Sequence, residues 1–120
     1  MNREESSTDL GKIKIHRNVI ASITSIAALQ TEGVKDIGKS FASRLREFLE
    51  KKEGPAQGSV RVELDKNGEV WVEIPLVIKY GYNIPDVAAK VQEHVRSSLE
   101  KMTSLAIKDV NVNVQGIEKG

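Results

Sequence analysis

The feature that most constrains the fold is a long alternating stretch over residues 69–80. Its apolar side chains recur at every second position, so that one face carries only Val70, Val72, Ile74, Leu76 and Ile78. This period of two is typical of a β-strand, and β-branched residues favour strands. A strand with one wholly apolar face is stable only when other elements cover that face. The sequence therefore predicts a layered fold built around this strand.

Three shorter strands are predicted beside it. Residues 60–64 alternate in the same way, and Asn67-Gly68 then carries the signal for a tight hairpin, since both residues tolerate a positive φ. Residues 11–16 and 110–115 also alternate, and they predict a first and a last strand. Pro75 has no amide donor, which suggests an edge position or a bulge in the long strand.

Helical periodicity occurs in three segments. Residues 17–31 and 40–52 repeat apolar side chains at spacings of three and four, and the segment after Asn83 does so for about five turns, to near Thr103. Asn83 is well placed to cap that last helix. The order is β-α-(α)-β-β-α-β. We therefore predict an α/β (α+β) two-layer sandwich, in which a mixed four-stranded sheet has its helices on one face.

Length and charge bound the function classes. Residues 1–9 are polar and predict a disordered leader, and residues 10–117 predict a single domain, because 120 residues are too few for a second core. The chain has no cysteine, and 18 basic against 17 acidic residues give a net charge of +1. The absence of cysteine excludes disulfides and thiolate zinc sites. The near-neutral charge lacks the basic excess of nucleic-acid-binding proteins. No apolar run reaches the ~20 residues that span a bilayer. We expect a cytoplasmic protein with no nucleic-acid partner and no direct membrane insertion.

One motif of nucleotide chemistry occurs, at Gly33–Ser40. It matches the phosphate-loop pattern, in which backbone amides hold phosphates, a lysine (here Lys39) contacts the terminal phosphates and a serine (here Ser40) contacts Mg²⁺. That chemistry needs a buried strand directly before the loop, whereas the preceding segment has helical periodicity. The favoured interpretation is a glycine that ends one helix, a loop, and the start of the next helix. Nucleotide binding is kept as an alternative.

No other group of residues predicts catalysis. His16 and His94 are isolated and are interpreted as solvated surface histidines, because neither has a second ligand at metal spacing. No serine lies in a strand-to-helix elbow, and the carboxylates are scattered. We expect a protein that is not an enzyme, with no catalytic residue, no cofactor and no metal site.

The outer face of the sheet is the surface with a chemical signature. Trp71 and Val77 point away from the in-phase valines and are flanked by polar strand residues, a pattern that often marks protein interfaces. Asn111 and Asn113 lie in a polar row that could make a ladder contact with another subunit. We predict these four as interface residues. An equally compatible alternative is that residues 40–52 or the leader cover Trp71 and Val77.

Several segments resemble the alkaline shock protein twenty-three (Gls-type) envelope stress response family. The segment Tyr80–Ala88 resembles the family's glycine-x-asparagine-isoleucine-proline junction, and Met102-Thr103 followed by Val110–Ile117 resembles its closing strand. The opening, Gly11–Ala21 with Glu32-Gly33-Val34, is similar too. The likeness covers roughly residues 10–117. The family often has a glycine at the position of Ser104.

The resemblance implies an α/β domain of Gram-positive-type bacteria, linked to cell-envelope homeostasis and stress, with no established catalytic residues. It also implies self-association into a homo-oligomer and docking to a small membrane-anchored protein of the same family. We therefore expect a non-enzymatic scaffold or adaptor, cytoplasmic and peripheral to the membrane through a partner. The alternative is a regulatory ligand-binding domain linked to fatty-acid or lipid metabolism.

Overall fold

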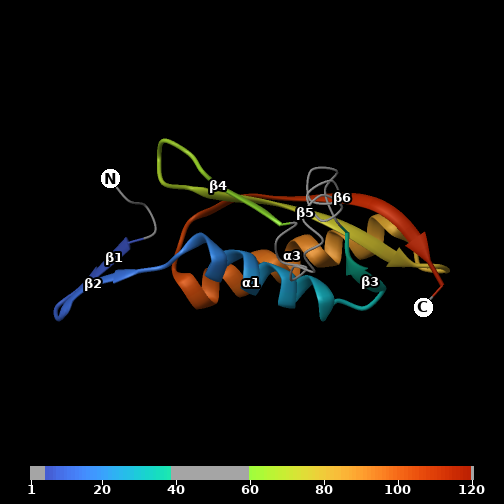
Figure 1. The fold of residues 1–120 in the computed structure, drawn as a ribbon, viewed down its shortest axis with the longest axis horizontal. Helices are drawn as coiled ribbons and strands as arrows, with labels where there is room; N and C mark the ends of the chain where they lie inside the picture. The colour runs from blue at the N-terminus through green and yellow to red at the C-terminus, as the bar shows by residue number, and fades with distance from the viewer. Residues whose placement is uncertain (1–4, 39–59, 120) are drawn as a thin grey trace, which may run out of the picture.

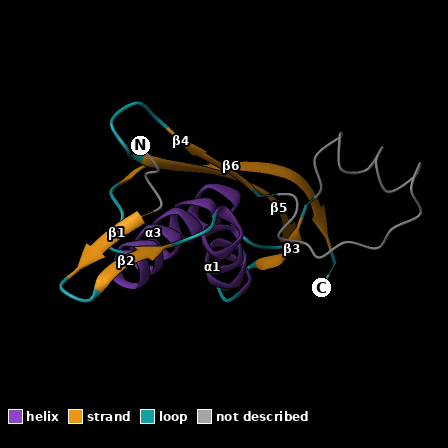
Figure 2. Ribbon diagram, turned by 60° about the vertical axis from the view of Figure 1, so that its left-hand side comes forward, coloured by secondary structure: helices purple, strands orange, loops and turns teal. Residues whose placement is uncertain are grey.

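The structure is a computed structural model that describes residues 5–38 and 60–119. Its two layers are a sheet and, on one face of that sheet, the helices α1 (Arg17–Leu29) and α3 (Ile84–Thr103) (Figures 1 and 2). The helix predicted over residues 40–52 lies outside the described residues.

The main sheet is organised around β5 (Val70–Lys79). On one side β6 (Ile107–Glu118) runs parallel to it along its whole length. On the other side β4 (Arg61–Leu64) and β3 (Val34–Ile37) follow one another, both antiparallel to β5. The predicted α+β class, with a mixed four-stranded sheet and helices on one face, is confirmed.

Pro75 lies inside this central strand rather than at an edge. Within the described residues, the pairing of β4 with β5 ends at Glu73 and that of β3 begins at Leu76. The Pro75 carbonyl accepts a hydrogen bond from the Gly38 amide at 2.8 Å. Because the amide and carbonyl of a strand residue point to the same side, the missing N–H faces the junction between the two shorter strands. Proline is tolerated there since few ladder bonds are lost.

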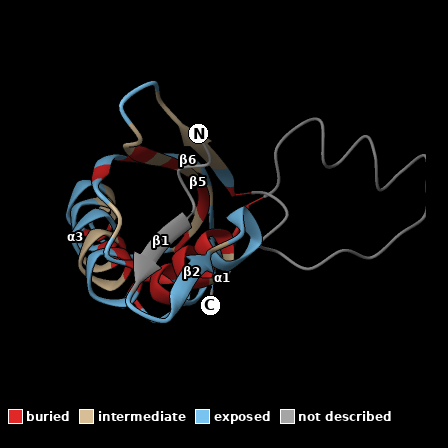
Figure 3. Ribbon diagram, turned by 90° about the vertical axis from the view of Figure 1, so that its left-hand side faces the viewer, coloured by how far each residue is buried: buried red, intermediate tan, exposed pale blue. Residues whose placement is uncertain are grey.

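The core lies between the sheet and the helices (Figure 3). All five in-phase side chains of β5 have an exposed fraction of 0%. α3 covers them with Val87, Val91, Val95 and Leu99, and α1 adds Ile20, Ile23, Ala27 and Ala28. Burying each large side chain contributes about 1.5–3 kcal/mol. This packing fixes which face of the sheet is left outside.

Both ends of α3 agree with the prediction. The Asn83 Oδ1 atom accepts a hydrogen bond from the Asp86 amide at 3.0 Å, which caps the first turn. The helix ends at Thr103 and is followed by Ser104 in the left-handed conformation, with φ 60°. The chain then continues from the end of α3 to the start of β6.

The N-terminal region differs from the prediction. β1 (Glu5–Thr8) pairs antiparallel with β2 (Gly11–Lys14) in a separate two-stranded sheet. The stretch 1–9, predicted as a disordered leader, thus contains a strand, because backbone pairing in a hairpin needs no apolar side chains. The strand predicted over residues 11–16 belongs to this hairpin and not to the main sheet.

The main sheet contains β3 in place of the strand predicted over residues 11–16. β3 lies inside a segment that is predicted to be a loop. Val34 and Ile37 are buried, whereas Lys35 and Asp36 are exposed. A register shift between Val34 and Asp36 breaks the period of two, as a bulge does. Four residues without alternation carry no strand pattern, so the sequence did not reveal this strand.

Candidate interaction surface

Trp71 lies on the face of the sheet that the described helices α1 and α3 leave uncovered, and it is partly exposed. Its neighbours across the sheet are Glu63 on β4 and Asp109 on β6. The guanidinium carbon of Arg61 lies 5.9 Å from the centroid of the indole ring, within the range of a cation–π contact. Arg61 also lies 3.4 Å from a carboxylate oxygen of Glu63. An aromatic side chain is thus held among charges of both signs.

Val77 lies at the other end of β5, paired with Asp36 on β3 and Gly116 on β6. It lies six positions after Trp71, which corresponds to about 20 Å along the strand. Glu73 and Pro75 lie between them on the same face. The two apolar side chains share a face but do not form one continuous patch.

Asn111 and Asn113 lie on β6, opposite Glu73 and Pro75 respectively. Both are exposed. Paired residues of neighbouring strands point to the same face, so all four predicted interface residues lie on the outer face of the sheet. The structure brings them onto one face without bringing their side chains together.

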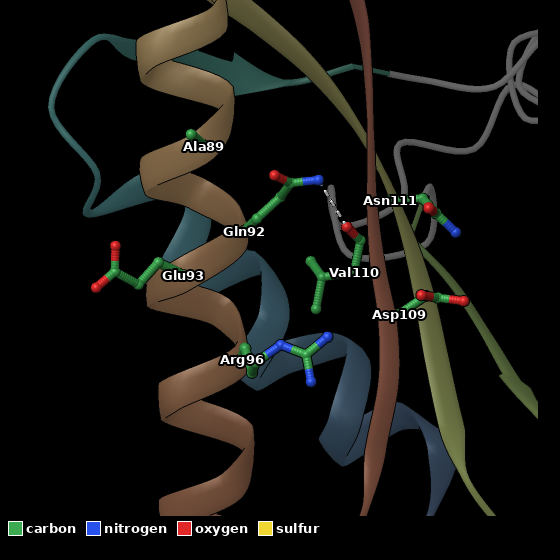
Figure 4. Close-up of a pocket in the computed structure, with 7 residues that line it drawn as sticks. All are labelled: Ala89, Gln92, Glu93, Arg96, Asp109, Val110 and Asn111. Atoms are coloured by element: carbon green, nitrogen blue, oxygen red, sulfur yellow. Dashed lines mark hydrogen bonds between the residues drawn. The ribbon is translucent and has the colours of Figure 1, made fainter.

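A groove between α3 and β6 was missed by the sequence reasoning. It has a volume of about 460 Å³ and is lined by Gln92, Arg96 and Val110, among others (Figure 4). The Gln92 Nε2 atom donates a hydrogen bond to the Val110 carbonyl at 3.0 Å. Arg96 donates from Nη1 to the Ile107 carbonyl at 2.6 Å and from Nη2 to the Lys108 carbonyl at 3.1 Å. Side chains of α3 therefore bind backbone carbonyls of β6, a contact for which the sequence carries no pattern.

A second, smaller groove of about 250 Å³ lies between α1 and α3. It is lined by the apolar residues Ile23, Ile26, Ala27 and Met102, together with Gln30 and Ser98. The periodicity places Ile26 and Met102 on the core-facing stripes of their helices, but Ile26 is 56% and Met102 68% exposed. The helix layer thus has an apolar outer surface of its own.

The described part of the nucleotide motif forms a strand rather than a phosphate loop. The Gly33 carbonyl accepts a hydrogen bond from the Lys79 amide, and the Gly38 amide is bound to the Pro75 carbonyl, both at 2.8 Å. Backbone groups paired to β5 at both ends of the segment are not free to surround a phosphate. Lys39 and Ser40 lie outside the described residues.

The histidines occupy unrelated positions. His16 is exposed at the start of α1, whereas His94 is partly buried, with Nδ1 3.2 Å from the Thr31 hydroxyl. His94 is therefore not the solvated side chain that was predicted. Within residues 5–38 and 60–119, no three His, Asp or Glu side chains come close enough to hold a metal ion together. Neither described helix combines the length and hydrophobicity needed to cross a bilayer.

Solved structures with a similar fold are C-terminal domains of MamM. The MamM-CTD H264A structure matches 84% of this chain and 98% of its own length, with a TM-score of 0.51 and 13% sequence identity. The MamM-CTD M250L structure matches with a TM-score of 0.52 and 12% identity. At this identity the likeness concerns the fold alone.

Sequence comparison gives closer relatives. The protein YqhY of Bacillus subtilis (strain 168) is 36% identical over 115 residues, which cover 96% of this chain and 83% of YqhY. A stress response regulator gls24 homolog of Streptococcus pyogenes serotype M3 is 26% identical over 116 residues, and the match spans 64% of that relative's length.

The model of the alkaline shock protein twenty-three family, which is described by a cell envelope-related function, matches residues 5–119. This match covers nearly the whole chain, and it agrees with the junction and closing-strand segments that carry the resemblance. The chain therefore belongs to the alkaline shock protein twenty-three family.

Proposed function

We propose that the protein is a non-enzymatic scaffold or adaptor that supports cell-envelope stress homeostasis. It self-associates and docks to a membrane-anchored partner of the same family, so that a cytoplasmic protein becomes peripheral to the membrane. The family's cell envelope-related description and the stress-response names of its relatives support a stress-related role. The observation that carries the docking step is the partly exposed Trp71 on the outer face of the sheet, which neither described helix covers.

The surroundings of Trp71 suit a protein interface. Tryptophan and arginine are the residues most enriched among those that dominate binding energies. The Arg61 contact holds the indole ring in place, which lowers the entropy lost on binding. Glu63 and Asp109 supply a charged rim that selects a complementary partner.

The test is co-purification of the tagged chain from its own host, followed by mass spectrometry of the proteins that remain bound. We expect the wild type to retain a small membrane protein, and Trp71→Asp and Val77→Asp to lose it. Val19→Asp is the matched control, because Val19 is an exposed apolar residue of α1 in the opposite, helical layer. If both outer-face variants keep the partner and the oligomer size of the wild type, the interface lies elsewhere.

The groove between α1 and α3 favours a second candidate, a regulatory domain that binds an acyl ligand. Beneath α3 the space is filled, since Val91, Val95 and Leu99 have an exposed fraction of 0%. An acyl chain would instead lie along Ile26 and Met102 in the open groove. Native mass spectrometry of the protein from its host tests this, and a spectrum without any added ligand mass would contradict it.

A further inference from the structure

β6 is an edge strand of the main sheet. Among the described strands it pairs only with β5, so its other side presents backbone N–H and C=O groups to the surroundings. Such an edge is a template for another strand, and proteins usually protect it with charges, proline, bulges or a covering element.

The first half of this edge is protected. Arg96 and Gln92 of α3 bind the outward carbonyls of Ile107, Lys108 and Val110. Lys108 and Asp109 add charges on the strand itself. An incoming strand would have to displace these contacts, so pairing in this half is disfavoured.

The second half is open. One turn before Gln92, α3 carries Ala89, whose methyl side chain is too short to reach the strand (Figure 4). Strand residues alternate in direction, so Val112 and Val114 point their backbone groups the same way as the Val110 carbonyl, away from β5. Within the described part of the chain, these outward groups of Val112 and Val114 have no hydrogen-bond partner.

The side chains of the open half also lack the usual protection. Residues 110–117 read VNVNVQGI, with no charge and no proline, in a chain that is 29% charged. The exposed Asn111, Asn113 and Gln115 are uncharged hydrogen-bonding groups. The register shift of β6 against β5 in this half comes only after Val114, so residues 110–114 have no charge, no proline and no bulge that would oppose a second strand.

We propose that the open half of β6 pairs antiparallel with the same segment of a second copy of this chain. The proposal rests on the self-association in the proposed function, and it names the surface and the register. Because the outward backbone groups of Val112 and Val114 are open, they pair with one another: Val112 of one copy lies opposite Val114 of the other, and each such pair exchanges both N–H···O bonds.

This register is self-complementary on the outer face. Asn113 meets Asn113 of the other copy across the two-fold axis, and Asn111 meets Gln115, all on the outer face. Amide side chains both donate and accept, so each pair forms a hydrogen bond without a charge. The contact is isologous and therefore closes as a dimer.

Cysteine cross-linking tests the register in the full chain, which contains no cysteine of its own. Residues 113 and 113 form a non-hydrogen-bonded pair with a Cα separation of about 4.5 Å, which a disulfide spans. We expect Asn113→Cys to give a covalent dimer as the main product of mild oxidation. Asn111→Cys and Gln115→Cys should each remain uncross-linked alone, and their mixture should give the covalent dimer.

Sedimentation of the wild type separates the possible failures. If the wild type is a dimer or larger and Asn113→Cys does not cross-link, β6 pairing is wrong, while self-association through another surface stands. Equal cross-linking of all three single variants would also overturn the register, since it would reflect random collisions. If the wild type sediments as a monomer at every concentration, both the pairing and the self-association in the proposed function are wrong.

Discussion

Gly33 follows the end of α1 and packs against Tyr82 and Val87 at the start of α3. Its φ is 95°, and a Cβ atom there would lie 2.7 Å from Val87 Cγ2 and 2.9 Å from Tyr82 Cδ2. Both the backbone conformation and the contact require glycine. The residue that begins the nucleotide motif is thus explained by packing.

Gly33→Ala should therefore destabilise the fold by about 2–4 kcal/mol, combining strain at positive φ with overpacking. Gly81→Ala is the matched control, because Gly81 has φ 97° but no atom within 4 Å of the added Cβ. Gly81→Ala should lower the free energy of unfolding only by the strain at positive φ, about 1 kcal/mol. Urea unfolding measures both, and equal losses would show that the contact with Val87 and Tyr82 contributes nothing.

Ser104 is the non-glycine residue with positive φ in the described chain. It ends α3 at the position where glycine is most favourable, and L-residues are strained there. Ser104→Gly should raise the free energy of unfolding by about 0.5–1 kcal/mol. Ser97→Gly, inside the same helix, should instead lower it by about 0.5–1 kcal/mol. Thermal unfolding of the two variants checks the opposite signs.

At the scale of elements, the hairpin between β4 and β5 depends on Asp65. Its Oδ1 atom accepts hydrogen bonds from the amides of Asn67 at 2.8 Å and Glu69 at 2.9 Å, and its Oδ2 atom lies 3.3 Å from Lys108 Nζ. Gly68 alone takes positive φ, so the turn is not the two-residue form in which Asn67 would do so as well. The carboxylate therefore organises a longer turn than the Asn-Gly pair predicted.

These contacts make the hairpin sensitive to pH. The Glu69 amide, ahead of the Asn67 amide and Lys108, holds the pKa of Asp65 below its usual value, against a smaller opposing effect of burial. A carboxyl whose pKa is lowered by folding adds stability above about pH 4, and this contribution declines as the pH falls through the folded pKa.

Asp65→Asn should be less stable than the wild type at pH 7, and the difference should shrink in acid. Urea unfolding at several pH values tests this, with Glu100→Gln as the control for losing one exposed charge. A difference that is constant with pH would contradict it.

Helices and strands with a clear apolar periodicity were predictable from the sequence. Features that depend on contacts with other elements of the fold were not. β5 and α3 were found within a residue or two, because alternation over ten residues and an Asn83 cap are local signals. β3 was missed because a bulge removes its alternation. The outer-face position of Trp71 followed from its phase in β5. The protection of β6 by Gln92 and Arg96 did not, because it depends on how α3 lies across the sheet.

At the scale of the whole molecule, pairing through β6 would join two main sheets into one. The helices of both copies cover the same side, so the joined sheet presents one continuous outer face with two copies of Trp71. A partner clustered in a membrane could then engage both at once. Two linked contacts bind more tightly than either alone, by a factor on the order of 10²–10⁴. Self-association and docking would thus be coupled without any contact between their residues.

Ala89→Arg tests this coupling, because it extends the row formed by Gln92 and Arg96 by one turn and brings a guanidinium to the open edge of β6. Ala89 is exposed and arginine is a good helix former, so the fold should be unaffected. We expect the variant to sediment as a monomer and to lose most of the co-purified membrane partner, although Trp71 and Val77 are intact. Lys90→Arg, the next exposed position on α3, is the control and should behave as the wild type. A monomeric Ala89→Arg variant that keeps its full partner recovery would show that one copy of the outer face is sufficient for docking.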